Sequence, residues 1–115
     1  MFSSISVPPN VNVSYEVSRR FISLQCHSSG VPQNYTYAEW EHLSTYSEHI
    51  RYFNGTNKGK LIIPRVKWPD ESYQDTGIYK CKVSNGIIDP DGNQFQEGQV
   101  PIILNGYYYY SLFNF

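Results

Sequence analysis

The spacing of two cysteines and the residues around them places the strongest constraint on the fold. Cys26 and Cys81 lie 55 positions apart, and Trp40 follows the first of them by 14 residues. The second cysteine ends the run Asp75-Thr76-Gly77-Ile78-Tyr79-Lys80-Cys81. Strand alternation gives each of these residues apolar neighbours on the same face: Ile22 and Leu24 with Cys26, Ala38 with Trp40, and Tyr79 and Val83 with Cys81. These three faces predict one shared core.

The pattern along the chain is all-β. Short β-branched or alternating runs are separated by turn residues, and helical periodicity of useful length is absent. The runs predict seven strands, at Val11 to Val17, Arg20 to Cys26, Tyr35 to His42, His49 to Phe53, Lys60 to Val66, Gly77 to Ser84 and Gln99 to Leu104. About seven strands in a chain of 115 residues favour a single β-sandwich or a small barrel.

The cysteine, tryptophan and Asp-x-Gly-x-Tyr-x-Cys residues together resemble the framework of the immunoglobulin superfamily. The resemblance covers roughly residues 5 to 105. It implies an immunoglobulin-like Greek-key sandwich of two sheets, with a Cys26–Cys81 disulfide between the sheets, Trp40 packed against it and Tyr79 as a tyrosine corner. The domain is assigned to residues 1–105. The aromatic tail, 106–115, is interpreted as a linker or an artefactual extension.

The resemblance leaves some alternatives open. The two cysteines could instead be buried free thiols, as in intracellular muscle-type immunoglobulin domains. The segment Trp68 to Gln74 is an insertion relative to the family pattern, and there is little room for a strand between Phe53 and Lys60. Pro64 falls inside a predicted strand, which is tolerated at a sheet edge or an outward position. The subtype stays open between intermediate (I-set), C2-like and variable domains.

The expected function is non-catalytic recognition or adhesion. As part of a larger cell-surface or secreted protein, the domain is expected to bind another protein, or a second copy of itself. Two surfaces are candidates: the exposed face of the third and sixth predicted strands with Arg51 and Phe53 beside it, and the segment Asn85 to Gly98. The candidate contact residues are Tyr37, Glu39, Glu41, Arg51, Phe53, Lys80, Lys82, Ile87, Ile88 and Phe95. Opposed carboxylates and ammoniums on the first surface also suit a plain, charge-paired sheet face.

The expected location is extracellular. Three glycosylation sequons occur, at Asn12, Asn34 and Asn54, and with a disulfide they favour the secretory pathway. The first residues do not resemble a signal peptide, so the chain is either a domain excised from a longer protein or a cytosolic protein, and the expected disulfide favours the first interpretation. A formal net charge of −1 gives no reason to expect nucleic acid, and membrane attachment is expected only through a segment outside this chain.

No chemistry-bearing motif stands out, and neither an enzyme nor a cofactor is expected. His27, His42 and His49 lack the spacing of a metal site. Asp89, Asp91 and Asn93 alternate as in some calcium loops, but the downstream ligands are missing. Two other functions are considered: a structural spacer in a tandem immunoglobulin array, and a carbohydrate-binding β-sandwich that uses some of the eleven tyrosines as platforms.

Overall fold

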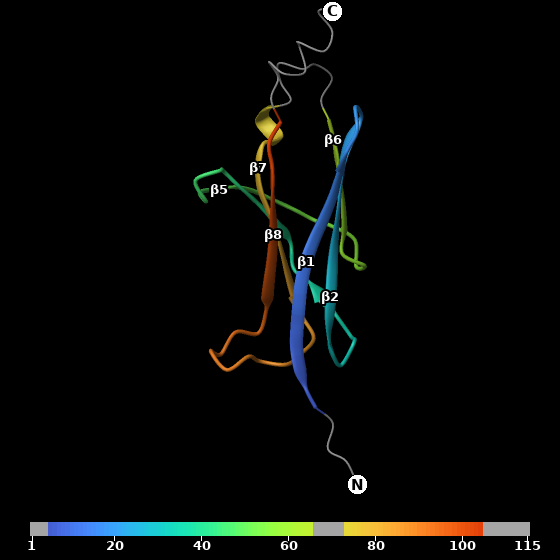
Figure 1. Ribbon diagram of the computed structural model, residues 1–115, viewed down its shortest axis with the longest axis vertical. Coiled ribbons are helices and arrows are strands. Elements are labelled where there is room, and N and C mark those ends of the chain that lie inside the picture. Colours follow the sequence, from blue (N-terminus) through green and yellow to red (C-terminus); the bar gives the residue numbers. More distant parts are fainter. Residues whose placement is uncertain (1–4, 66–72, 105–115) are drawn as a thin grey trace, which may run out of the picture.

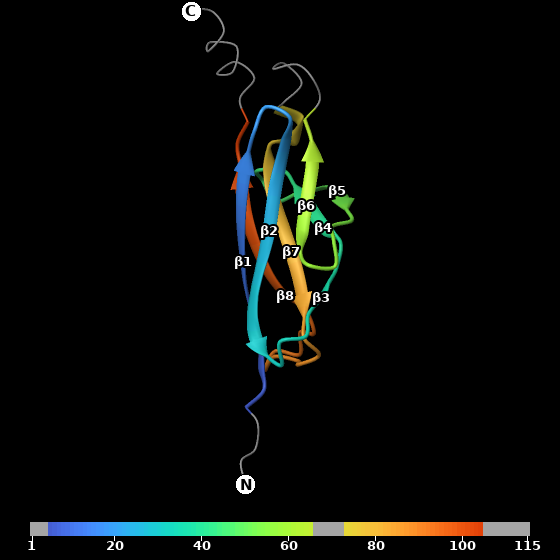
Figure 2. The ribbon, with the colours of Figure 1, turned by 90° about the vertical axis from the view of Figure 1, so that its right-hand side faces the viewer.

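The computed structural model describes residues 5–65 and 73–104, whose strands form two antiparallel sheets packed face to face (Figures 1 and 2). Sheet A has the order β1-β2-β6, formed by β1 (Val7–Val17), β2 (Phe21–Val31) and β6 (Lys60–Pro64). Sheet B consists of β3 (Thr36–Tyr37), β4 (Trp40–Leu43), β5 (His49–Phe53), β7 (Gly77–Ser84) and β8 (Gln96–Ile102). The predicted all-β sandwich of two sheets is confirmed.

Strand β7 is the centre of sheet B. It pairs with β8 on one side and with β3 and β4 on the other, and β5 lies beyond β4. A short 3₁₀ turn, Tyr73–Asp75, precedes β7. Both β5 and β7 have the predicted bounds, whereas β1 and β2 are longer than predicted. Strand β8 begins at Gln96 instead of Gln99, so the loop before it is shorter than the predicted segment Asn85 to Gly98.

The third predicted strand, Tyr35 to His42, is interrupted. Its two parts, β3 and β4, are separated by Ala38 and Glu39, although the Ala38 N–H still donates to the Lys82 carbonyl at 3.0 Å. The interruption breaks the two-residue alternation. Tyr37 packs against the core beside buried Trp40, three residues away, and does not point outward as predicted.

The core lies between the inner faces of the two sheets. The Cys26–Cys81 disulfide joins β2 to β7 across it, as predicted. Trp40 has only 1% of its surface exposed, and Ile22, Leu24, Tyr79 and Val83 have none. The remaining buried hydrophobic members of this cluster are Leu61, Ile63 and Ile102. The faces predicted from alternation in β2 and β7 are therefore the faces that meet.

The edges of the sandwich differ. On one side β1 lies beside β8 (Figure 1), and the backbones approach so closely at Gly98 that a Cβ there would lie 2.8 Å from the Val11 carbonyl oxygen. On the other side β6 is an edge strand, and Pro64 sits exposed within it. An edge position explains how the strand accommodates a residue without an N–H. No helix in the part of the chain that the structure describes is long and apolar enough to cross a membrane.

Candidate interaction surface

The side chains of β4, β5, β7 and β8 that point away from the core form the outer face of sheet B. Because Tyr79 and Cys81 point inward, their neighbours Lys80 and Lys82 point outward. Cross-strand pairing then places Glu41 opposite Lys80, and Lys80 opposite Gln99. The face also carries Tyr52, His49 and Glu97.

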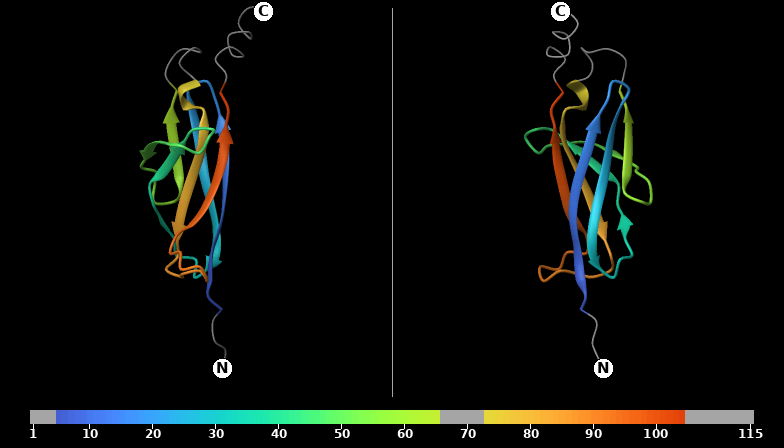
Figure 3. Two further views of the ribbon diagram at one scale, coloured as in Figure 1. Left: turned by 90° about the vertical axis from the view of Figure 1, so that its left-hand side faces the viewer. Right: turned by 45° about the vertical axis from the view of Figure 1, so that its right-hand side comes forward.

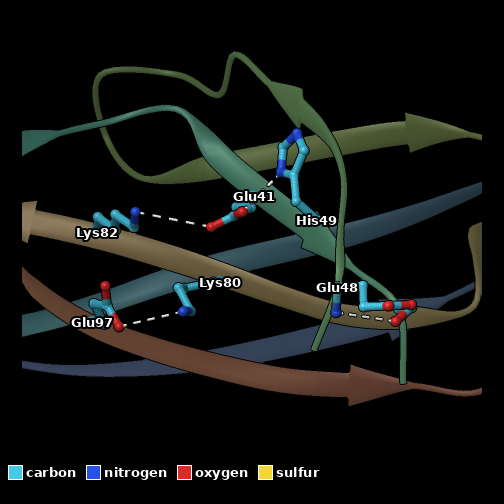
Figure 4. Close-up of polar contacts among 7 residues, drawn as sticks. Glu41, Glu48, His49, Lys80, Lys82 and Glu97 are labelled. Carbon is cyan, nitrogen blue, oxygen red and sulfur yellow. Dashed lines mark hydrogen bonds and ion pairs between the residues drawn. The ribbon is translucent and has the colours of Figure 1, made fainter. Parts of the chain in front are cut away.

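Hydrogen bonds and ion pairs connect most of the charged side chains on this face (Figure 4). The Oε2 atom of Glu41 lies 2.8 Å from Nδ1 of His49, and Oε1 of the same carboxylate lies 3.9 Å from Nζ of Lys82. Lys80 pairs separately with Glu97, at 3.4 Å. The Glu41 side chain is only 12% exposed. The face is thus a network with fixed positions for both signs of charge, although each exposed pair contributes little to stability.

An exposed aromatic side chain lies within this network. Tyr52 is 54% exposed, and its ring centroid lies 4.5 Å from that of His49. Neither residue was among the predicted contact residues. The position of Tyr52 could have been predicted from the alternation of side chains along the strand His49 to Phe53. If Phe53 points inward, its neighbour Tyr52 must point outward.

The structure divides the residues predicted for this surface. Glu41, Lys80 and Lys82 lie together on the outer face of sheet B. Arg51 and Phe53 pair with His42 and Trp40, on the inner side of β5, and Phe53 packs against the core. Tyr37 is also directed to the core, whereas Glu39 is exposed in the interruption between β3 and β4.

A polar cluster lies on the inner side of the same strands; His42 and Asp75 are buried in it, whereas the Arg51 side chain is 39% exposed. Arg51 donates from Nη2 to Asp75 Oδ1 at 2.7 Å and from Nε to His42 Nδ1 at 3.0 Å. The opposite ring nitrogen, Nε2, lies 2.9 Å from the Thr76 carbonyl oxygen and therefore carries the proton of a neutral imidazole. His42 stacks on Tyr79 with a centroid distance of 4.4 Å. The Tyr79 hydroxyl donates to the Asp75 carbonyl, the upstream backbone bond expected of a tyrosine corner.

Burial sets the protonation states of this cluster. Loss of hydration lowers the pKa of His42 below 6.5, and the proximity of Arg51 lowers it further. Burial, together with the nearby Asp75 carboxylate, raises the pKa of Tyr79 to about 12. Both rings are therefore neutral at physiological pH. The polar groups of this cluster bind one another.

The loop between β7 and β8 forms the second predicted surface. Asp89 organises it: Oδ1 accepts from the Asn93 and Asp91 N–H groups at 2.8 and 3.0 Å, and Oδ2 accepts from the Gln96 side chain at 3.0 Å. These bonds, first that from Gln96, lower the pKa of Asp89. Ile88 is 61% exposed on this loop. Ile87 and Phe95 are only half-buried and do not share that exposure.

The three sequon asparagines are all exposed. Asn12 lies on β1, Asn34 in the turn between β2 and β3, and Asn54 directly after β5. None of them lies on β4, β7 or β8, the strands that carry the centre of the outer face of sheet B.

The described side chains show no arrangement typical of a metal centre. Within residues 5–65 and 73–104, no group of three or more histidine, cysteine, aspartate or glutamate residues is placed to hold a metal ion. Comparisons with protein-family models, with curated proteins and with solved structures found no match to this chain.

Proposed function

We propose that the chain is an immunoglobulin-like recognition domain of the extracellular type, which binds a protein partner through the outer face of sheet B. Four features support an immunoglobulin-like framework. They are the disulfide between β2 and β7, the buried Trp40, the Tyr79 to Asp75 bond and the placement of β4, β7 and β8 in one sheet. A disulfide in a small β domain is also compatible with an oxidising compartment.

The observation that carries the choice of surface is the position of Tyr52 within the ion-pair network. An exposed tyrosine supplies a large contact area with few rotatable bonds, and tyrosine is enriched among residues that dominate binding energy. The neighbouring carboxylates are already held in place, Glu41 by its contacts with His49 and Lys82 and Glu97 by its ion pair with Lys80. Fixed charges of both signs favour a partner with the complementary pattern and accelerate its association.

Two of the three sequon positions agree with this choice of surface. A glycan on Asn12 would project from sheet A, and a glycan on Asn34 would project from the turn between β2 and β3. Asn54 lies where the chain leaves β5, at the edge of sheet B. Glycans on Asn12 and Asn34 would leave the outer face of sheet B accessible to a protein, whereas a glycan on Asn54, two residues after Tyr52, would border the contact.

The experiment is a binding screen with the domain presented as a multimer to an array of cell-surface and secreted proteins. Any partner found is then tested against Tyr52→Ala and Lys80→Glu. Loss of Tyr52 is expected to weaken binding at least about tenfold, and Lys80→Glu is expected to slow association most strongly at low salt. Ile62→Ala is the matched control, because Ile62 is 48% exposed on β6 of the other sheet.

Two results would contradict the proposal. One is a screen in which no protein binds, particularly if a glycan array run in parallel gives a signal that depends on Tyr52. That outcome would favour the carbohydrate-binding alternative. The other is a partner whose affinity is unchanged in Tyr52→Ala and Lys80→Glu.

The extracellular location has a separate test. The protein is expressed through the secretory pathway of a eukaryotic host, and its intact mass is measured by mass spectrometry before and after reduction and deglycosylation. We expect a disulfide and glycan mass on at least one of Asn12, Asn34 and Asn54. Secretion with free thiols and no glycan would instead favour an intracellular spacer.

A further inference from the structure

The chain leaves sheet B at the end of β5 and crosses to β6 of sheet A through residues 54–59 (Figures 1 and 3). Strands β5 and β6 are the edges of their sheets, on the side of the sandwich away from β1 and β8. The crossing begins with the sequon Asn54-Gly55-Thr56. Asn54 is exposed and follows Tyr52 by two residues, so this sequon borders the surface proposed for recognition.

Asn54 is directed to the same side of sheet B as Tyr52. Its neighbour Phe53 packs against the core, and a Cβ on its other neighbour, Gly55, would lie 2.6 Å from Nε1 of the buried Trp40. Because both neighbours face inward, alternation along the chain directs Asn54 outward. Positions two residues apart on a strand are separated by about 6.6 Å. Asn54 and Tyr52 are therefore adjacent on the outer face of sheet B.

The crossing holds the sequon in a fixed position. The Thr56 N–H donates to the Lys60 carbonyl at 2.8 Å, and the Thr56 hydroxyl oxygen accepts from the Lys60 N–H at 3.1 Å. The close approach of Gly55 to Trp40 anchors the preceding residue. A group attached to Asn54 would therefore start from a defined point at the edge of sheet B.

We propose that Asn54 carries an N-linked glycan that covers Tyr52 and so regulates access to the outer face of sheet B. In its attachment, Nδ2 of Asn54 forms a bond to the anomeric carbon of a sugar carried on a lipid pyrophosphate. The carbon–oxygen bond to the phosphate breaks, the lipid pyrophosphate leaves with the bonding electrons, and the amide gives up a proton. The attached glycan is bulky and occupies the space above Tyr52 that a partner would need. The regulatory role rests on the proposed function.

The other two sequons do not have this effect. Asn12 pairs with His27 in sheet A, and Asn34 lies in the turn between β2 and β3. A chain that is glycosylated there and not at Asn54 keeps the outer face of sheet B open. Occupancy of a single sequon therefore separates an open form of the domain from a covered form.

The test uses the domain secreted from a eukaryotic host with Asn54 as its one remaining sequon, after Asn12→Gln and Asn34→Gln. Peptide mass spectrometry locates the glycan, and tyrosine is iodinated before and after enzymatic removal of the glycan. Iodination of Tyr52 is expected to be largely suppressed in the glycosylated form and to recover after removal. Tyr15 on β1 is the matched control, because it is 48% exposed and Tyr52 is 54% exposed. Its iodination is expected to be equal in the two forms.

A second variant separates covering at Asn54 from a general effect of glycans. It keeps only the Asn12 sequon, through Asn34→Gln and Asn54→Gln, and its Tyr52 is expected to react equally before and after removal of the glycan. A secreted protein without glycan on Asn54 would overturn the proposal. Equal iodination of Tyr52 in the Asn54-glycosylated and deglycosylated forms would overturn it as well.

The partner from the binding screen separates this inference from the proposed function. Its affinity for the Asn54-glycosylated domain is expected to be at least about tenfold weaker than for the deglycosylated domain, since contact with Tyr52 is lost. If Tyr52 is protected from iodination but the partner binds both forms equally, the covering is correct and recognition through Tyr52 is wrong. If Tyr52 is not protected, the covering is wrong whatever the partner does.

Discussion

Arg51 on β5 donates a hydrogen bond from Nε to Nδ1 of His42 on β4, at 3.0 Å. Arginine can only donate, so this bond requires an unprotonated Nδ1. The other ring nitrogen is committed to the Thr76 carbonyl at 2.9 Å, and the ring has no exposed surface. Folding therefore selects the neutral form of His42.

This selection predicts a loss of stability in mild acid. The pKa of His42 is lowered from 6.5 in the folded protein, mainly by burial. Below pH 6.5 the unfolded chain takes up a proton on His42 that the folded chain does not. The free energy of unfolding therefore decreases as the pH is lowered, until the pKa of His42 in the folded protein is reached. Urea unfolding at pH 7.5, 6.5, 5.5 and 5.0 measures the effect.

The variant His42→Gln tests whether this residue is responsible. It is expected to be less stable than the parent at pH 7.5 and to show a smaller further loss between pH 7.5 and 5.0. His27→Gln removes an exposed imidazole and is expected to keep the parent's loss, because His42 is intact. Equal slopes in the parent and in His42→Gln would show that other groups govern the acid response.

We expect removal of the Tyr79 hydroxyl to lower the free energy of unfolding. In Tyr79→Phe the buried ring and its stacking on His42 are retained, but the bond to the Asp75 carbonyl is lost. An unsatisfied buried acceptor costs about 1–3 kcal/mol, so the free energy of unfolding is expected to fall by that amount. Tyr35→Phe is a useful comparison, because the Tyr35 hydroxyl accepts from the Gly30 N–H in a less buried setting. A Tyr79→Phe protein as stable as the parent would mean that water or another donor replaces the bond.

We expect removal of the disulfide to cause a large loss of stability. Closing a loop of 55 residues stabilises a chain by about 4 kcal/mol in the entropy model, comparable with the total stability of a small domain. We expect Cys26→Ala to be unfolded or nearly so at 37 °C, as measured by circular dichroism and thermal melting. A melting temperature within a few degrees of the parent's would show that the core alone maintains the fold.

The core was predictable because β2 and β7 alternate without interruption through their cysteines. Ile22, Leu24, Tyr79 and Val83 follow directly from that period. Alternation failed at Tyr37, because the break at Ala38 and Glu39 changes which face each residue occupies, and no glycine or proline marks that break. Alternation also indicated that His42 points inward, but histidine is a polar residue and did not suggest a core position. His42 shares the inward parity of Trp40, and a buried histidine becomes reasonable only once Arg51 and the Thr76 carbonyl are known to face it.

The contact surfaces were less predictable than the core, since they depend on pairings between distant strands. The partners of Glu41 are His49 and Lys82, although the register places Lys80 directly opposite it. The Asn85 side-chain amide donates to the carbonyl of Val7, 78 positions earlier in the sequence, and to that of Pro32, 53 positions earlier. Neither relationship leaves a local pattern in the chain. The predicted tail, 106–115, and most of the predicted insertion lie outside the described residues.

Among the glycines of the described residues, Gly77 is the one at which we expect a side chain to be tolerated least. Its φ of +146° is one that side-chain-bearing residues rarely adopt, and a Cβ would collide with the Leu43 carbonyl oxygen and lie 2.7 Å from His42 Nε2. We expect Gly77→Ala to displace His42 from the Thr76 carbonyl and to prevent folding or lower stability by more than about 3 kcal/mol. Gly92→Ala is the matched control, because its φ is also positive, +89°, but nothing lies within 4 Å of its Cβ. That variant is expected to lose only about 1–2 kcal/mol. Similar losses in the two variants, measured by urea unfolding, would mean that the positive φ alone, and not the close approach of β4, makes Gly77 necessary.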